Sequence, residues 1–150
     1  MRNILMTLIL ISISFLNSYS QAHKYSSSDE EIAFGGYDLV SYFDDSPAKG
    51  IEKYQYEYDG LTLYFSTYRN YLIFKKEPLK YMPAYGGWCA TAVAGDILTK
   101  PDYSMFKIQE EKLLFFEVKA FFNGKTYWEK NPEANVLVAD KKYQKKFGEK

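Results

Sequence analysis

The sequence predicts an α+β fold in which a small, mainly antiparallel sheet, built from two hairpins, is covered by helices. Three observations lead to this prediction. An Asp-Gly pair separates two strand-like runs, a second pair of such runs follows further along the chain, and helical periodicity comes after each pair. About 130 residues remain after an N-terminal export signal, which is the size of one domain with its own core.

The first hairpin is predicted within residues 54–65. Tyr54–Tyr58 alternates aromatic and polar residues, and Leu61–Phe65 is rich in residues that favour strands. Asp59-Gly60 lies between them, and this dipeptide between two such runs is a strong signal for a tight hairpin.

A helix should follow this hairpin directly. Ser66 or Thr67 can cap its first turn, and the apolar residues at 68, 71, 72 and 74 have helical spacing. Because proline cannot continue a helix, we expect this one to end before Pro78.

The second half of the chain repeats this order. Met105–Gln109 and Lys112–Phe116 predict a hairpin that turns at Glu110-Glu111. Val118–Trp128 and Ala134–Phe147 then read as helices. The second of them is capped by Asn131 and has proline in its first turn.

Residues 1–20 are predicted to be a signal peptide. Arg2 supplies the positive charge, and Ile4–Phe15 is a nearly unbroken apolar run. Cleavage can fall before Gln21 or before His23, and both sites stay open. The run is shorter than the roughly 18 residues that a membrane span needs, so we expect an exported protein, periplasmic or extracellular, without a membrane span in its mature chain.

Residues 21–32 should be a flexible lead-in, because Ser26–Glu31 is rich in polar residues, and residues 33–150 should form the domain. Nineteen basic and nineteen acidic residues balance, so the composition argues against a nucleic-acid partner. The single cysteine cannot form an internal disulfide, and packing by fifteen Tyr and eleven Phe must stabilise the fold instead.

Several motifs occur in an order that is similar to the YHS domain family. They are Gly35–Phe43, Tyr58–Ser66, the spacing of Phe74, Pro78 and Tyr81, and Tyr85–Ala90. From about Gly35 to about Asp140 the chain resembles the exported, single-domain branch of that family. The resemblance implies a YHS-like α+β fold and a link to heavy-metal handling, since other members are appended to copper-transporting ATPases.

Metal-linked YHS domains carry paired cysteines near the end of the second strand and the start of the helix. This chain has Ser66–Asn70 at the matching place, so those cysteines are absent. With one Cys and one His, the sequence excludes a structural zinc site of four such ligands. Cys89 with the thioether of Met82, or of Met105, could instead hold Cu(I). The alternative is that both methionines fill gaps in an aromatic core.

Cys89 has three interpretations that the sequence leaves open. It is a small buried hydrophobe, a metal ligand or reactive thiol beside Gly86-Gly87, or half of an intermolecular disulfide. His23 offers a further copper site, because cleavage after Ala22 would place its imidazole beside the new terminal amine. The alternative is that His23 belongs to a linker.

Two Gly-Gly turns flanked by aromatic residues suggest a ligand pocket. In the first turn, Asp38 can cap a short helix through Phe43, and the simpler alternative is a turn with a cap. If the turns converge, one concave aromatic pocket is formed. Its predicted residues are Tyr37, Asp38, Tyr42, Tyr85, Gly86, Gly87, Trp88 and Cys89.

The sequence shows no Ser-His-Asp set and no phosphate-binding glycine loop, so we expect binding rather than catalysis. The leading hypothesis is an exported YHS-like binding module for a metal ion, with copper favoured, or for a small ligand. The alternative is a protein-interaction or adaptor domain that presents aromatic residues on an edge strand or on the C-terminal helix.

Overall fold

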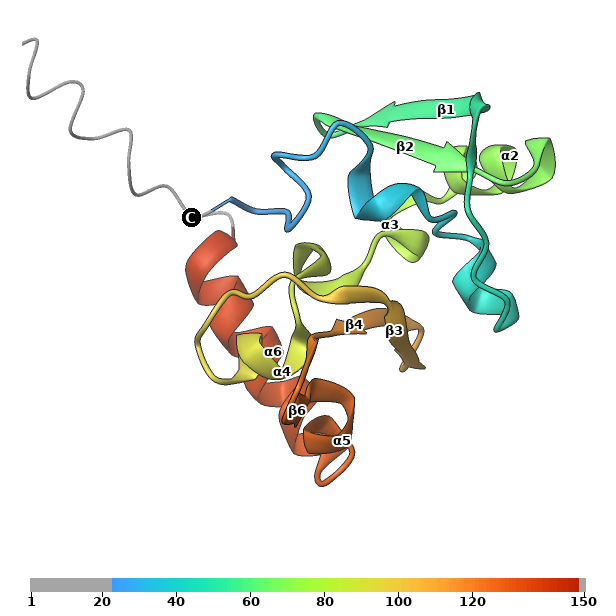
Figure 1. The fold of residues 1–150 in the computed structure, drawn as a ribbon. Helices are drawn as coiled ribbons and strands as arrows, with labels where there is room; N and C mark the ends of the chain where they lie inside the picture. The colour runs from blue at the N-terminus through green and yellow to red at the C-terminus, as the bar shows by residue number, and fades with distance from the viewer. Residues whose placement is uncertain (1–22, 149–150) are drawn as a thin grey trace, which may run out of the picture.

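The computed structural model describes residues 23–148, so the predicted signal peptide and both cleavage sites lie outside the described residues. Two-stranded antiparallel sheets and helices follow one another along the chain, which confirms the predicted α+β class (Figure 1). None of the helices within residues 23–148 has both the length and the apolar character that a membrane crossing requires.

The first hairpin and its helix form as predicted. β1 (Ile51–Tyr58) pairs with β2 (Leu61–Phe65) through a turn at Asp59-Gly60, where both residues have positive φ. This is the backbone that a two-residue hairpin loop requires. α2 (Tyr68–Lys76) follows, and α3 (Pro78–Tyr81) begins at the expected break.

Of the two predicted caps for α2, the structure uses Thr67. The Thr67 Oγ1 atom accepts a hydrogen bond from the Asn70 amide at 3.1 Å. This bond satisfies one of the amides that the first turn of a helix leaves without a partner.

The second hairpin is also confirmed, with β3 (Asp102–Gln109) and β4 (Lys112–Phe116) joined at Glu110-Glu111. The two hairpins were expected to build one sheet, but within residues 23–148 each remains a separate two-stranded sheet. A short third pair, β5 (Val118–Lys119) with β6 (Phe122–Asn123), follows β4.

The predicted helix Val118–Trp128 is wrong over its first half. Residues 118–123 form the β5–β6 pair, and only α5 (Gly124–Trp128) is helical. The Gly124 amide donates to the Glu117 carbonyl at 2.9 Å, and the Asn123 side chain caps α5 by accepting from the Thr126 amide. These bonds outweigh a weak helical periodicity.

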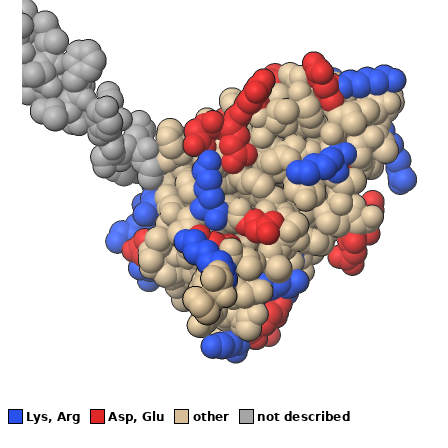
Figure 2. Space-filling model, viewed as in Figure 1, with Lys and Arg blue, Asp and Glu red and all other residues tan. Residues whose placement is uncertain are grey.

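Between residues 23 and 148, the remaining elements are α4 (Ala90–Ala94), α6 (Pro132–Phe147) and the 3₁₀ turns η2 (Ala33–Gly36), η3 (Ser41–Asp44) and η4 (Ala84–Gly87). Asn131 stands at the N-cap of α6 as predicted, although its side chain makes no capping bond. On the face shown in Figure 2, basic and acidic side chains are interspersed.

In the described part of the chain, most of the core lies in two clusters of buried side chains. The first, which includes Phe34, Tyr42, Phe65 and Phe74, lies under the first hairpin and α2. The second, which includes Tyr85, Phe116, Trp128 and Val136, lies between β4 and α6. Most of the large members are aromatic, as the composition predicts.

Asp38 is a fully buried carboxylate that joins three segments of the first cluster. Its Oδ2 accepts from the Ser66 amide at 2.8 Å, from the Ser66 hydroxyl at 2.5 Å and from the Asn70 amide group at 2.8 Å. Its Oδ1 accepts from the Val40 amide at 3.0 Å. Asp38 thus shapes the turn before η3 and also holds the end of β2 and the start of α2. This is a larger role than the predicted cap.

Asp38→Asn should lower the free energy of unfolding by about 3 kcal/mol. The NH₂ group of asparagine in place of Oδ2 would point its hydrogens at the Ser66 and Asn70 groups that now donate to Oδ2. These buried donors would then lose their acceptor. Urea denaturation followed by circular dichroism measures the loss. Asp44→Asn is the matched control, because Asp44 is exposed and should change stability by less than about 0.5 kcal/mol. Equal effects of the two substitutions would contradict this role for Asp38.

Candidate functional site

The two Gly-Gly turns have the same backbone conformation. Phe34 has φ 52° and ψ 38°, and Tyr85, at the same place in the second turn, has φ 55° and ψ 32°. Both glycines that follow each aromatic residue also have positive φ. The left-handed backbone conformation of an aromatic residue costs about 1–2 kcal/mol. Burial of the Phe34 and Tyr85 rings offsets this cost.

The turns converge, as the pocket hypothesis required. A Cβ atom added to Gly87 would lie 2.5 Å from the ring of Phe34, so the backbone of the second turn rests directly on the aromatic side chain of the first. Contact of this kind fills the space between the turns. Phe34 is 0 % exposed and Tyr85 is 5 % exposed, so the meeting point is part of the core rather than an open pocket.

Residues 23–32, expected to be a flexible lead-in, lie against this meeting point. The Ser26 amide donates to the Gly86 carbonyl at 2.9 Å, and the Tyr143 hydroxyl donates to the Lys24 carbonyl at 2.9 Å. The Ser27 hydroxyl accepts from the Phe34 amide at 2.9 Å, and both serines are buried. The segment therefore closes the space in which the sequence had placed a ligand.

The other predicted pocket residues are spread around this core. Tyr42 is fully buried and donates its hydroxyl to the Tyr103 carbonyl at 2.7 Å, and burial raises its pKa well above the usual range. Tyr37 is half-buried, with the Lys49 ammonium 3.7 Å from its ring centroid. Trp88 donates its indole N–H to the His23 carbonyl at 3.2 Å. These side chains do not face one shared opening.

Cys89 lies in the core, which favours the interpretation as a small buried hydrophobe. It is 0 % exposed, and a Cβ added to Gly124 would lie 3.3 Å from its sulfur. Met82 packs against the first core cluster and Met105 against the second. Within residues 23–148, no three His, Cys, Asp or Glu side chains gather as a metal site would require.

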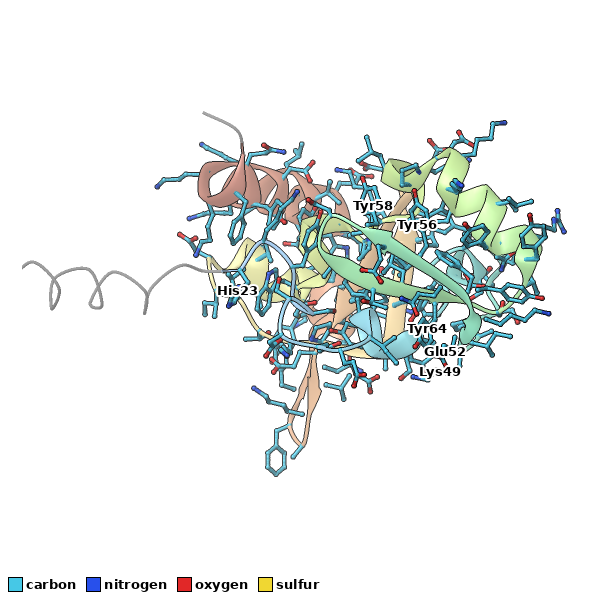
Figure 3. The ribbon with its side chains drawn as sticks, turned by 90° about the horizontal axis from the view of Figure 1, so that it is seen from above. His23, Lys49, Glu52, Tyr56, Tyr58 and Tyr64 are labelled. Atoms are coloured by element: carbon cyan, nitrogen blue, oxygen red, sulfur yellow. The ribbon has the colours of Figure 1, made fainter. Side chains whose placement is uncertain are left out.

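His23 is exposed at the start of the described chain. Figure 3 shows it far from Glu52 and Tyr64 on the first hairpin and from Lys49 just before that hairpin. The His23 carbonyl is held by Trp88, but its imidazole has no hydrogen-bond partner among the described residues.

An open cavity of about 780 Å³ lies beside the second turn, where α3 and η4 face α6 and the turn of the second hairpin. Two residues from the predicted site, Met82 and Tyr85, line it. The other lining residues are Leu79, Lys80, Pro83, Ala84, Glu111, Lys112, Asp140, Tyr143 and Gln144.

A polar cluster forms one wall of this cavity. The Tyr85 hydroxyl donates to Asp140 Oδ1 at 3.0 Å, and Lys112 Nζ lies 2.9 and 2.7 Å from the two carboxylate oxygens of Asp140. Burial first, and then the Asp140 carboxylate, raise the pKa of Tyr85 far above its usual value. At neutral pH this tyrosine is therefore a protonated donor.

Sequence reasoning found the Tyr85 side of the cavity and missed Lys112 and Asp140. These two lie on the second hairpin and on α6, far apart in the sequence. No protein-family model matches this chain, and no curated protein or solved structure matches it either. The YHS resemblance therefore stays a prediction from motifs.

Gly87→Ala should destabilise the protein by about 3 kcal/mol, because a methyl group at this position overlaps the Phe34 ring. Gly60→Ala is the matched control. Gly60 has a φ of +77°, close to the +78° of Gly87, but nothing lies within 4 Å of its added Cβ. The control should cost only about 1 kcal/mol for the left-handed backbone. Thermal and urea unfolding compare the two variants, and equal losses would show that the turns do not touch.

The Cys89 thiol should react with 5,5′-dithiobis(2-nitrobenzoate) only when the protein unfolds, because its sulfur is enclosed. The rate in increasing urea should follow the unfolded fraction. A Cys89→Ala/Ala120→Cys variant supplies the control, since residue 120 is exposed and its thiol should react at once. Rapid labelling of native Cys89 would instead restore the accessible-thiol hypothesis.

Proposed function

We propose that this chain is an exported, YHS-like binding module that takes a small organic ligand in the cavity beside the second Gly-Gly turn. The observation that carries the proposal is the cavity itself. Its volume of about 780 Å³ lies in the range of small-molecule sites, and it combines an apolar wall with a few convergent polar groups.

The lining indicates what kind of ligand fits. Leu79, Met82 and Pro83 offer apolar contact, and methionine adapts its shape to different partners. At the polar wall, the charge of Lys112 is already compensated by Asp140, and the other two charged lining residues, Lys80 and Glu111, have opposite signs. A neutral head group that can both donate and accept, such as a hydroxyl or an amide, therefore suits this cavity better than a charged one.

Copper, the other ligand predicted from the sequence, receives less support. Cu(I) sites use thiolate and thioether ligands that meet at one ion. Here Cys89 is enclosed in the core, while Met82 lines the surface cavity. The small organic ligand therefore comes first in this proposal.

Protein interaction is the second candidate, and one observation favours it. On α6, the C-terminal helix named in the sequence alternative, Leu137 is 71 % exposed and Val138 is 42 % exposed. Lys141 and Lys145 border them. Apolar side chains exposed side by side and rimmed by charge are typical of a docking surface.

The test is a fragment screen by ¹⁵N NMR on the chain from Gln21, with small neutral alcohols and amides that carry an apolar ring or alkyl group. Bound fragments should shift the amides of residues 79–85 and 140–144. Lys112→Met should weaken the best fragment about tenfold, because one charge-assisted hydrogen bond is lost. Lys107→Met is the matched control. Lys107 lies on the same hairpin as Lys112 and also forms an ion pair, with Glu129, but it does not line the cavity.

Fragments that bind Lys112→Met as well as the wild type would contradict the proposed site, as would shifts confined to other elements. A parallel Cu(I) titration addresses the metal. One equivalent bound by the wild type and lost in Cys89→Ser would favour the copper hypothesis over the organic ligand.

A further inference from the structure

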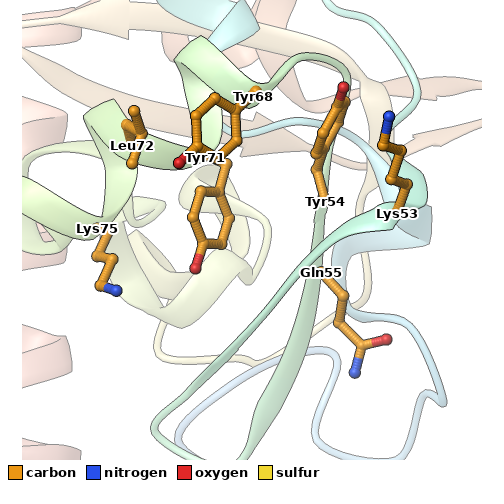
Figure 4. A pocket seen from close by; sticks show the side chains of 7 residues that line it. All are labelled: Lys53, Tyr54, Gln55, Tyr68, Tyr71, Leu72 and Lys75. Atoms are coloured by element: carbon orange, nitrogen blue, oxygen red, sulfur yellow. The ribbon is translucent and has the colours of Figure 1, made fainter.

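We propose that a second site, the groove between β1 and α2, binds a small planar aromatic anion. This groove is separate from the cavity beside the second turn and shares no lining residue with it. Its volume is about 620 Å³. It is lined by Lys53, Tyr54, Gln55, Tyr68, Tyr71, Leu72 and Lys75 (Figure 4).

A β-bulge gives the groove one of its walls. The pairing of β1 with β2 shifts between Ile51 and Gln55, so residues 52–54 do not pair in register with β2. A bulge of this kind bends its strand and redirects the side chains next to it. Three consecutive residues, 53–55, consequently line one groove, although alternate residues of a regular strand point to opposite faces.

Three tyrosines supply flat surfaces for stacking. Tyr68 and Tyr71, on the first turn of α2, stack with an interplanar angle of 14° and centroids 5.9 Å apart. The ring of Tyr54 lies 6.1 Å from that of Tyr68, tilted by 45°. Tyr68 remains 57 % exposed. A planar ligand laid on Tyr68 would bury aromatic surface that is now in water, and aromatic pairs gain about 0.5–1.5 kcal/mol beyond that burial.

Two lysines determine the charge of the ligand. Figure 4 shows Lys53 and Lys75 on opposite sides of the groove with the tyrosine rings between them. Lys53 Nζ lies 5.3 Å from the Tyr54 centroid, and Lys75 Nζ lies 5.9 Å from that of Tyr71. Within residues 23–148 neither ammonium group forms an ion pair, and no carboxylate lines the groove. The groove therefore complements an anion.

This charge pattern differs from that of the cavity, where two carboxylates, Glu111 and Asp140, line the same space as Lys80 and Lys112. The groove is also small, and the nineteen basic and nineteen acidic residues of the chain leave no excess charge to attract a polyanion. The fitting ligand is a small molecule with a planar ring and one or two terminal anionic groups. Carboxylate and phosphate both meet this description.

Two probe pairs test the inference on the chain from Gln21. Naphthalene-2,6-dicarboxylate is compared with its uncharged diamide, and flavin mononucleotide with uncharged riboflavin. Isothermal titration should show binding of an anionic probe at least tenfold tighter than that of its neutral partner. ¹⁵N NMR should place the shifts at residues 53–55 and 68–75. Added salt should weaken binding, because the two lysines are near the surface.

Substitutions locate the probe. Lys53→Met/Lys75→Met keeps most of each apolar stem and should lower affinity at least tenfold, and Tyr68→Ala should also weaken binding. Lys130→Met is the matched control, since Lys130 Nζ lies 4.3 Å from the Tyr127 centroid but outside the groove. Circular dichroism confirms that each variant is folded. Lys112→Met, which tests the cavity, should leave probe affinity unchanged.

The two anionic probes distinguish the source of the charge. Tighter binding of the dicarboxylate assigns a carboxylate ligand, and tighter binding of flavin mononucleotide assigns a phosphate. The inference is overturned if neither anion binds at millimolar concentration, if the neutral partners bind equally well, or if the double lysine variant retains full affinity.

Discussion

The close contact between Gly87 and the ring of Phe34 is the constraint on which the rest of the structure depends. Phe34 belongs to the first core cluster, and the turn that holds Gly87 also carries Tyr85 of the second. Only a residue without a side chain permits this approach, and the left-handed backbone of each turn directs its aromatic ring into its own cluster. The two core clusters are thus joined by contact between the Gly87 backbone and the Phe34 ring. Ser26 and Ser27 cover this contact through their hydrogen bonds to Gly86 and Phe34.

Local signals allowed the hairpins and the first helix to be predicted. Asp59-Gly60 adopts the backbone that its sequence favours, and Thr67 caps α2 through a bond within its own turn. The first half of the predicted helix Val118–Trp128 failed because the Gly124 amide closes onto the Glu117 carbonyl and Asn123 caps α5, and these short-range bonds outweigh the helical periodicity. Whether the two hairpins pair with each other depends on distant residues, and nothing in either hairpin indicates that they would not.

The candidate site was predictable in part, for the same reason. The repeated pattern of aromatic residue, two glycines and aromatic residue raised the hypothesis that the turns converge, and in the structure they are alike and in contact. Whether a ligand or the protein fills the meeting point depended on residues 23–32, whose polar composition resembles that of a linker. The buried serines satisfy their hydroxyl groups through Tyr103, which lies more than seventy residues away. Lys112 and Asp140 of the cavity are also brought to Tyr85 only by the fold.

A core packed in this way leaves recognition to places where a helix meets an irregular strand or turn. The cavity lies where the short α3 and the η4 turn face α6, and the groove lies where the bulge in β1 faces α2. Their electrostatics differ because the two lysines that line the cavity are accompanied by two carboxylates, whereas the two lysines that line the groove have none beside them. A compensated ion pair offers hydrogen bonds without net charge, whereas unpaired ammonium groups attract an anion before contact. The presence or absence of carboxylates beside the lysines, more than the number of aromatic residues, therefore separates the ligand classes of the two sites.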